Sequence, residues 1–467
     1  MIKRTFAQIA QLSGGTLSPA AEQVNDHTIE GVTTDSRKIE PGQLFIPLKG
    51  ENFNGHHFVE DALGMGAALA FWETGEGEAP EHLPLVLVDN TLEALQQLAA
   101  SYRAQLPVRV IGVTGSNGKT TTKDMVAAIL STTYKVHKTQ GNFNNHIGLP
   151  LTLLQLEEDT EMAVIEMGMS GRGEIDLLSS IAGPEAALIT NIGESHLLQL
   201  GSRKAIAEAK LEITAGLKAD GLLVYNGDEP LLEEGLKQLD LPEEMLRFRF
   251  GMGDTNDLYP VGVMTDGDGT RFTLNLPNSS AFFIPMLGIH NVSNALAAIA
   301  VSKYMGVSEA DIAKGLKDLK VTGMRIEIVK GKTGLTILND AYNASPTSTK
   351  AALRLLEDLS GYRKKIAVLG DMLELGSEEA DFHREIGRGL QPHLIDYVYT
   401  YGELAKLIAE EAEKQYPAGR VQAFDSKEDI VKKIASIVEP DVDIVLVKGS
   451  RGMKLEDVVN GLSELHF

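Results

Sequence analysis

The chain of 467 residues contains no cysteine. Disulfide bonds and metal sites built on thiolates are therefore excluded. Long apolar runs are missing as well, because no stretch approaches the ~18 residues that a membrane-spanning helix needs. Residues 1–12 predict a short amphipathic helix and not a signal peptide. These absences favour a cytoplasmic protein without a membrane segment.

Basic residues are scarce relative to acidic residues. The chain has 43 Lys and Arg against 65 Asp and Glu, and its formal net charge is -22. This balance argues against a general binder of nucleic acid or of membrane surfaces. It is compatible with local basic pockets that hold phosphates. We therefore expect no nucleic-acid partner and no membrane partner, and we expect the chain to be a monomer.

A chain of 467 residues is too long for one ordinary core, so we expect several domains. The pattern of apolar runs divides the chain into three units. Residues 1–106 hold short elements, with expected strands at 44–48 and 85–88 and expected helices at 58–65 and 92–106. In residues 107–322, nearly continuous apolar strands alternate with helices, which predicts a parallel sheet covered on both faces. The strands of this unit are expected at 108–113, 162–167, 186–190, 222–226 and 282–287.

Residues 323–467 show the same alternation, which predicts a second doubly wound α/β domain. Its strands are expected at 335–339, 365–369, 397–401, 421–424 and 444–447, with helices at 347–359 and 403–414. The fold class is therefore α/β with three domains. An N-terminal α/β domain is followed by a central P-loop domain with a parallel sheet and by a C-terminal Rossmann-like domain.

The most informative motif lies at residues 114–121. A β-branched run leads into Thr-Gly-Ser-Asn-Gly-Lys-Thr-Thr, and an amphipathic helix follows. A strand, a glycine-rich turn and a helix in this order hold nucleotide phosphates, because curled backbone N–H groups face the anion. Lys119 adds a positive charge, and Thr120 offers a hydroxyl to a magnesium ion. In one departure, Val113 stands where the usual P-loop has its first glycine, and Gly112 lies one residue earlier.

Two further strands end in polar residues at the same edge of the predicted sheet. Glu166 ends one apolar strand, and Asn191, Glu194 and His196 follow the next. Ligands bind at the carboxyl ends of strands in open α/β sheets, so Glu166 is a candidate metal ligand. The alternative is a glutamate that caps a nearby loop. A neutral imidazole at His196 can bind a metal or a phosphate, and the alternative is an ordinary loop residue.

Other candidates carry weaker local signals. Lys210 lies in a predicted helix, where the sequence alone indicates a surface lysine. Asn291 and Asn294 open a helix on one face, so they either cap it or hold a planar base. Arg325 lies where the central unit gives way to the last one. Asp340 follows a strand, where an aspartate often bonds a ribose hydroxyl.

Taken together, these motifs resemble the Mur ligase family. The resemblance rests on residues 114–121, 141–150, 165–168, 190–196, 208–210, 288–294 and 339–346. Residues 34–50, 368–376 and 448–454 resemble one member of the family more than its siblings. The ordered set covers all three units, which makes the resemblance highly specific.

The resemblance implies an ATP-dependent amide ligase that uses Mg2+. In this family, ATP phosphorylates a carboxylate and an incoming amine then attacks the acyl phosphate. For the best-matching member, the implied substrates are a UDP-muramoyl-tripeptide and D-alanyl-D-alanine, joined in peptidoglycan synthesis. Phosphorylation supplies the leaving group that a carboxylate lacks, while magnesium and basic groups neutralise about four clustered negative charges.

The resemblance also implies roles for individual residues. The phosphates of ATP are assigned to Gly115, Ser116, Asn117, Gly118, Lys119, Thr120, Thr121 and, for the γ-phosphate, Arg325. The metal is assigned to Thr120, Glu166, His196 and Lys210, which is carbamylated in the family. Adenine is assigned to Asn291 and Asn294, the ribose to Asp340, and a positioning role near the metals to His290. The first domain is expected to bind the UDP end through Ser36 and Arg37. The peptide or dipeptide is assigned to Asn144, Asn145, Tyr342, Asn343 and residues 448–451.

Three alternatives remain open from the sequence. Another amide ligase of the same family, acting on muramoyl peptides or on folylpolyglutamate, would accept a different amine. A P-loop switch or motor would release phosphate slowly without any acyl acceptor. A non-catalytic relative is disfavoured, because Lys119, Glu166 and Lys210 are all present.

Overall fold

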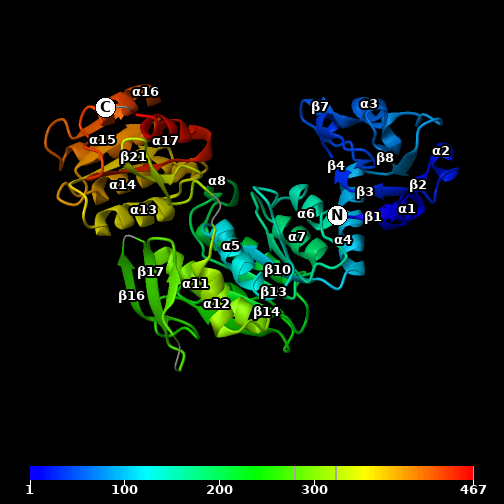
Figure 1. Ribbon diagram of the computed structural model, residues 1–467, viewed down its shortest axis with the longest axis horizontal. Coiled ribbons are helices and arrows are strands. Elements are labelled where there is room, and N and C mark those ends of the chain that lie inside the picture. Colours follow the sequence, from blue (N-terminus) through cyan, green and yellow to red (C-terminus); the bar gives the residue numbers. More distant parts are fainter. Residues whose placement is uncertain (267, 278–279, 321–322, 466–467) are drawn as a thin grey trace.

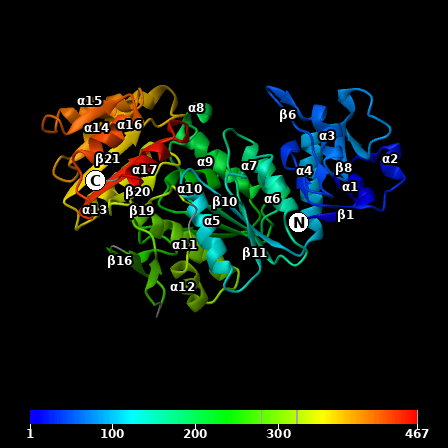
Figure 2. The same cartoon turned by 45° about the horizontal axis from the view of Figure 1, so that its top comes forward.

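The computed structural model describes residues 1–467 apart from 267, 278–279, 321–322 and 466–467. Three α/β domains follow one another, with the central domain between the other two (Figure 1). The tilted view in Figure 2 keeps this order. The predicted fold class is confirmed, whereas the predicted boundary after residue 322 falls on residues 321–322, outside the described residues. Within the described ranges, every helix is too short or too polar to span a bilayer.

The central domain contains a six-stranded sheet, ordered β11-β12-β10-β13-β14-β15, in which all neighbours are parallel. Its strands are β10 Arg109–Thr114, β11 Val136–Lys138, β12 Met162–Glu166, β13 Ala186–Ile189, β14 Leu222–Asn226 and β15 Leu246–Phe250. Its helices are α5 Lys119–Leu130, α6 Gly148–Leu154, α7 Glu174–Ala182, α8 Leu197–Leu200, α9 Arg203–Leu211, α10 Pro230–Leu236, α11 Ile289–Tyr304 and α12 Glu309–Lys317. Apolar cores lie on both faces of the sheet, as the continuous apolar strands predict.

One strand predicted for this sheet lies elsewhere. The segment 282–287 forms β18 Phe282–Ile284, which pairs antiparallel with β17 Gly269–Leu274, itself paired with β16 Pro260–Asp266. Its residues are apolar because Phe282 and Ile284 pack in the core beside α11 and α12. Strands β11 and β15 were not predicted, since both lie at sheet edges and alternate apolar with basic residues.

The C-terminal domain contains a second six-stranded sheet, ordered β19-β20-β24-β21-β22-β23. Its strands are β19 Glu327–Lys330, β20 Thr336–Asp340, β21 Lys364–Gly370, β22 Tyr397–Tyr401, β23 Val421–Phe424 and β24 Asp443–Lys448. Its helices are α13 Pro346–Asp358, α14 Glu379–Gly389, α15 Ala405–Glu413, α16 Lys427–Ala435 and α17 Glu456–Ser463. The five predicted strands are present and parallel, and the unpredicted β19 pairs antiparallel at the edge.

The N-terminal domain has a mixed sheet, ordered β2-β9-β8-β5-β4, and a small sheet of β1 and β3. Its strands are β1 Lys3–Thr5, β2 Thr16–Leu17, β3 Thr28–Glu30, β4 Val32–Thr33, β5 Leu44–Phe45, β6 Lys49–Gly50, β7 Phe53–Asn54, β8 Leu69–Glu73 and β9 Leu85–Val88. Its helices are α1 Phe6–Ser13, α2 Pro19–Glu22, α3 Val59–Gly64 and α4 Thr91–Gln105. The helix predicted over 1–12 begins only after β1, because the Thr5 side chain caps it.

Candidate functional site

A cavity between the central and C-terminal domains is lined by residues at the ends of strands from both sheets. The predicted site residues that line it are Ser116, Asn117, Gly118, Lys119, Thr120, Thr121, Asn144, Glu166, His290, Asn291, Asn294, Arg325, Asp340, Tyr342, Asn343 and Lys448. Residues from segments more than 300 positions apart in the sequence therefore meet around one space.

The glycine-rich turn between β10 and α5 is held in shape by close contacts. Gly115 has a φ of +144°, and a Cβ there would lie 1.9 Å from Thr190 Oγ1. Gly118 has a φ of +79°, and its Cβ would lie 2.5 Å from Asn294 Oδ1. The backbone of Asn117 donates to Asn191 Oδ1 at 2.9 Å. Only glycine fits both positions, so the turn keeps this shape beside the N-terminus of α5.

Lys119 folds back over this turn. Its Nζ donates to the carbonyl of Gly115 at 2.7 Å and lies 3.4 Å from that of Ser116. Burial lowers the pKa of Lys119, while the nearby Glu166 carboxylate opposes that shift. The ammonium thus lies beside the amides of the turn, where a bound phosphate would meet both.

Glu166 is buried at the end of β12 and is held by two side chains. Its Oε2 accepts a hydrogen bond from Thr120 Oγ1 at 2.9 Å, and its Oε1 accepts one from Asn144 Nδ2 at 2.8 Å. The hydroxyl and the carboxylate are hard oxygen donors of the kind that Mg2+ prefers. Across the described ranges, no group of three His, Asp or Glu side chains forms a metal cluster by itself.

Lys210 is not the surface lysine that its helix suggested. It lies in α9 with 1% of its surface exposed, and its Nζ has no hydrogen-bond partner among the described residues. Burial lowers its pKa far below the usual value, and the charge of Lys119 adds to that shift. A lowered pKa increases the fraction of the amine that is uncharged and therefore nucleophilic.

Two histidines lie near these groups in neutral form. His196 has a φ of +65°, and its Nδ1 lies 2.9 Å from Glu374 Oε2 in the C-terminal domain. Burial lowers its pKa to about 4, and the charges of Lys119 and Lys210 contribute. His290 lies in the first turn of α11, and burial lowers its pKa to about 4 as well.

Asn291 and Asn294 do not cap α11, which begins after Gly288 without a side-chain cap. Asn291 Nδ2 donates to the carbonyl of Leu287 at 2.8 Å, and Asn294 Nδ2 donates to Asn291 Oδ1 at 3.2 Å. Both side chains are buried and line the cavity. The capping alternative is therefore wrong, and the two linked amides form part of the cavity wall that a planar ligand would meet.

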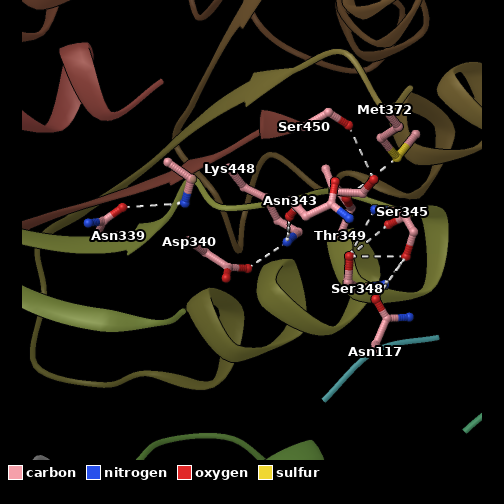
Figure 3. Close-up of polar contacts among 12 residues, drawn as sticks. Asn117, Asn339, Asp340, Asn343, Ser345, Ser348, Thr349, Met372, Lys448 and Ser450 are labelled. Atoms are coloured by element: carbon pink, nitrogen blue, oxygen red, sulfur yellow. Dashed lines mark hydrogen bonds and ion pairs between the residues drawn. The ribbon is translucent and has the colours of Figure 1, made fainter. Parts of the chain in front are cut away.

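The C-terminal wall of the cavity is an ion-paired cluster (Figure 3). Lys448 is 2% exposed, and its Nζ donates to Asp340 Oδ2 at 2.6 Å and to the carbonyl of Asn343 at 2.9 Å. Arg325 stacks on the Tyr342 ring, with its guanidinium carbon 4.1 Å from the ring centroid. These contacts fix one carboxylate and one guanidinium at the cavity wall.

Residues 449–451 and six further predicted site residues lie outside the lining of this cavity. Gly115 is beneath Thr190, and Asn145 accepts hydrogen bonds from backbone amides at the start of α6. Ser36 and Arg37 lie in a short 3-10 helix of the N-terminal domain, where Arg37 pairs with Asp35 at 2.8 Å. Lys210 and His196 lie behind the glycine-rich turn, close enough to Lys119 to respond to its charge.

The sequence did not reveal several residues that shape the site. Thr190 Oγ1 donates to the carbonyl of Asn117 at 2.6 Å, and Ser345 Oγ lies 3.4 Å from Asn117 Oδ1 across the two domains. Thr139 accepts a hydrogen bond from the Glu166 backbone at 2.9 Å. Thr139 follows the edge strand β11. Because β11 was not predicted from the sequence, the place of Thr139 beside Glu166 could not be predicted either.

Three family models match the chain in order. The Mur ligase family catalytic domain matches residues 28–103, the Mur ligase middle domain matches 113–302, and the Mur ligase glutamate ligase domain matches 324–451. The UDP-N-acetylmuramoyl-tripeptide–D-alanyl-D-alanine ligase of Bacillus subtilis (strain 168) is 54% identical over 464 residues, with 99% of each chain covered. The enzyme of that name from Escherichia coli (strain K12) is 36% identical over 467 residues, with 99% of each covered.

Solved structures show the same relation. MurF from Acinetobacter baumannii superposes with a TM-score of 0.89 at 32% identity, covering 99% of both chains. MurF ligase from Thermotoga maritima, solved in complex with ADP, superposes with a TM-score of 0.81 at 29% identity, covering 93% of this chain and 97% of that one.

Proposed function

The chain belongs to the Mur ligase family, and we propose that it adds D-alanyl-D-alanine to a UDP-N-acetylmuramoyl-tripeptide in peptidoglycan biosynthesis. It does so as an ATP-dependent, ADP-forming ligase. The observation that carries this function is the cavity in which Lys119 of the central domain faces Arg325 and Asp340 of the C-terminal domain. The identity with the Bacillus subtilis ligase over nearly the whole chain selects the substrates.

The reaction couples two steps. The terminal carboxylate oxygen of the tripeptide attacks the γ-phosphorus of ATP, and the bond to the leaving ADP oxygen breaks. The amine of D-alanyl-D-alanine then attacks the acyl carbon and loses a proton, and the tetrahedral intermediate expels phosphate. The amide forms because phosphate is a better leaving group than an oxide ion.

The nucleotide is held from both domains. Lys119 and the backbone amides at the start of α5 bind its β- and γ-phosphates, and Arg325 reaches the γ-phosphate from the C-terminal domain. Asn291 and Asn294 contact the adenine. Asp340, oriented by Lys448, accepts a hydrogen bond from the ribose.

A magnesium site fits the residues beside the glycine-rich turn. The Thr120 hydroxyl and the Glu166 carboxylate already lie together, and His196 lies close enough to Lys119 for the lysine charge to lower its pKa. When bound, Mg2+ neutralises the charge that gathers on the transferred phosphoryl group. Thr120 and Glu166 would hold it through their oxygens, and Asn144 holds the carboxylate in place.

Lys210 completes this site as a carbamate. Its neutral amine attacks carbon dioxide, a new N–C bond forms, and a proton leaves the nitrogen. The product is an anion with two oxygens, which replaces a positive charge that would repel a metal. The buried Nζ has no hydrogen-bond partner among the described residues, so a carbamate there would remove an unpaired buried cation and add two oxygens that a metal can bind.

Substrate placement is divided among the domains. Ser36 and Arg37 hold the UDP end in the N-terminal domain, residues 1–106, and residues 323–467 bring the amine. Tyr342, Asn343 and residues 448–451 place the dipeptide, while Asn144 and Asn145 face the peptide tail. His290, uncharged and buried, positions the reacting groups. The enzyme works as a monomer in the cytoplasm, where ATP is available.

Measuring ADP release with varied acyl and amine substrates tests this function. We expect ADP to appear only when both UDP-muramoyl-tripeptide and D-alanyl-D-alanine are present. Release without any amine would indicate a nucleotide switch. Release with a single amino acid or glutamate in place of the dipeptide would assign the chain to another activity of the family.

A further inference from the structure

Glu166 is fixed through its backbone as well as through its carboxylate. Its backbone N–H donates to Thr139 Oγ1 at 2.9 Å, and Thr139 is completely buried after the end of β11. The backbone of Thr139 also donates to the carbonyl of Val164 at 3.1 Å, which prolongs the pairing of β11 with β12 by one residue. The direction in which Glu166 leaves β12 therefore depends on where Thr139 lies.

Thr139 is in turn held by a buried cation. Lys123 Nζ donates to the carbonyl of Thr139 at 2.8 Å, and the Lys123 side chain is only 2% exposed. Lys123 Nζ also lies 3.4 Å from Asp124 Oδ1, which pairs with Lys138 at 2.6 Å. Neither Lys123 nor Thr139 lines the cavity, so any effect of theirs on the site passes through another residue.

The spacing along α5 connects these contacts. Thr120 and Lys123 are three residues apart and share one helix face. Thr120 binds the Glu166 carboxylate, and Lys123 binds the loop that holds the Glu166 backbone. One face of α5 therefore fixes both the carboxylate and the backbone of Glu166.

Burying an ammonium costs free energy that an apolar side chain of similar length would not cost. Burial lowers the pKa of Lys123, and the carboxylates of Asp124 and Glu166 counter this shift. A side chain retained for packing alone would not need the charge. The charge of Lys123 strengthens the hydrogen bond to Thr139 and gives a positive electrostatic potential at Glu166.

We propose that Lys123 and Thr139 are positioning residues that set the Glu166 carboxylate for the magnesium ion of the proposed ligase. The inference rests on the proposed function for the identity of that ion. Loss of either residue lets Glu166 turn away from Thr120. The metal-dependent part of nucleotide binding then weakens, while the metal-free part stays the same.

Calorimetry on the full-length protein tests this inference, with ADP titrated in the presence of Mg2+ or of a chelator. We expect Lys123→Met and Thr139→Val each to weaken ADP binding in Mg2+ by about tenfold, the size of one lost hydrogen bond to a charged or buried group. Binding in chelator should change by less than about twofold. Thr139→Ser, which keeps the hydroxyl, should restore the affinity.

Amide hydrogen exchange supplies a second readout that needs no ligand. The Glu166 amide should exchange faster in Lys123→Met and in Thr139→Val than in the unmodified protein, because its acceptor is displaced or absent. Lys365→Met is the matched control. It removes a lysine that donates to the Glu357 carbonyl at 2.5 Å in the C-terminal domain, so it should alter stability and leave the Mg2+ effect intact.

Glu166→Gln tests the proposed metal site separately from the positioning role of Lys123 and Thr139. If Glu166→Gln leaves the Mg2+ effect unchanged, the proposed metal site is wrong. If Glu166→Gln abolishes the effect while folded Thr139→Val keeps it in full, only the positioning role is overturned. Should Lys123→Met fail to fold, the pair Thr139→Val and Thr139→Ser decides the question, because both retain the Thr139 backbone.

Discussion

The two junctions between domains differ in polarity. At the first, α4 of the N-terminal domain packs on α6 and α7 of the central domain, and residues of both domains share one apolar core. Tyr102 is fully buried there, and its hydroxyl donates to the carbonyl of Leu156 at 2.8 Å. This junction resembles the interior of a single domain, so we expect its two sides to move together.

The second junction, between the central and C-terminal domains, is largely polar. Thr347 Oγ1 donates to Glu194 at 2.8 Å, and the backbone of Leu198 donates to the carbonyl of Glu374 at 3.1 Å. The partly buried Phe382 of the C-terminal domain packs against the apolar core that the N-terminal and central domains share. Polar contacts exchange with water at small net cost, so this junction can open and re-form. The cavity lies here, which places the chemistry where the molecule is able to move.

The largest effect is expected from Lys119→Ala, which removes a cation from the central-domain wall of the cavity and leaves the hydrogen bonds described at both junctions in place. Turnover should fall by about 10³-fold or more, because the phosphate loses its buried cation. Steady-state rates and a thermal melt of the same sample check this expectation. A folded variant with near-normal ligation would remove Lys119 from phosphate binding.

Lys210→Ala should lower turnover by about 10²-fold or more, since the oxygens of the proposed carbamate are lost with the side chain. Added acetate should restore part of the rate by occupying the vacated oxygen positions. Mass spectrometry of the intact protein under carbon dioxide should find the extra mass on Lys210. Full activity of Lys210→Ala would leave this lysine without a role in the reaction.

A matched pair of variants compares the junctions directly. Tyr102→Ala should lower the free energy of unfolding by about 3–5 kcal/mol, the usual cost of removing a buried aromatic ring. Thr347→Val should lower it by about 1 kcal/mol or less, because only exchangeable hydrogen bonds are lost. Urea denaturation measures both. Equal losses would show that the junctions do not differ in the way described.

A smaller effect concerns pH at the polar junction. Burial lowers the pKa of His290 to about 4, so the native state stays unprotonated where the unfolded chain, with a pKa near 6.5, takes up a proton. Stability should therefore fall as pH drops from about 6.5 to about 4, by about 1–3 kcal/mol from this group. His290→Asn should flatten that part of the profile in urea denaturation. An unchanged profile would argue that His290 is solvated and titrates normally.

The strands that could be predicted from the sequence are those buried on both faces, because each is a continuous apolar run. Strands β10, β12 and β14 could be predicted in this way, and so could the glycine-rich turn. Edge strands such as β11 and β19 could not, because one side of each is polar. The burial of Lys210 was also hidden, since what packs over a helix is decided by other segments. The contacts of Asn117 and Glu194 with the C-terminal domain depend on tertiary structure in the same way.

The central claim is that the cavity closes at the polar junction while the apolar junction stays rigid. The absence of cysteine allows spin labels to be placed at will, so pairs at Lys237→Cys with Glu413→Cys and at Lys237→Cys with Gln23→Cys report on the two junctions. Distances are measured by pulsed electron paramagnetic resonance, with and without a non-hydrolysable ATP analogue and UDP-muramoyl-tripeptide. The account predicts that the first distribution narrows and shifts to shorter distances while the second stays fixed. An unchanged first pair, or a second pair that moves as much, would contradict it.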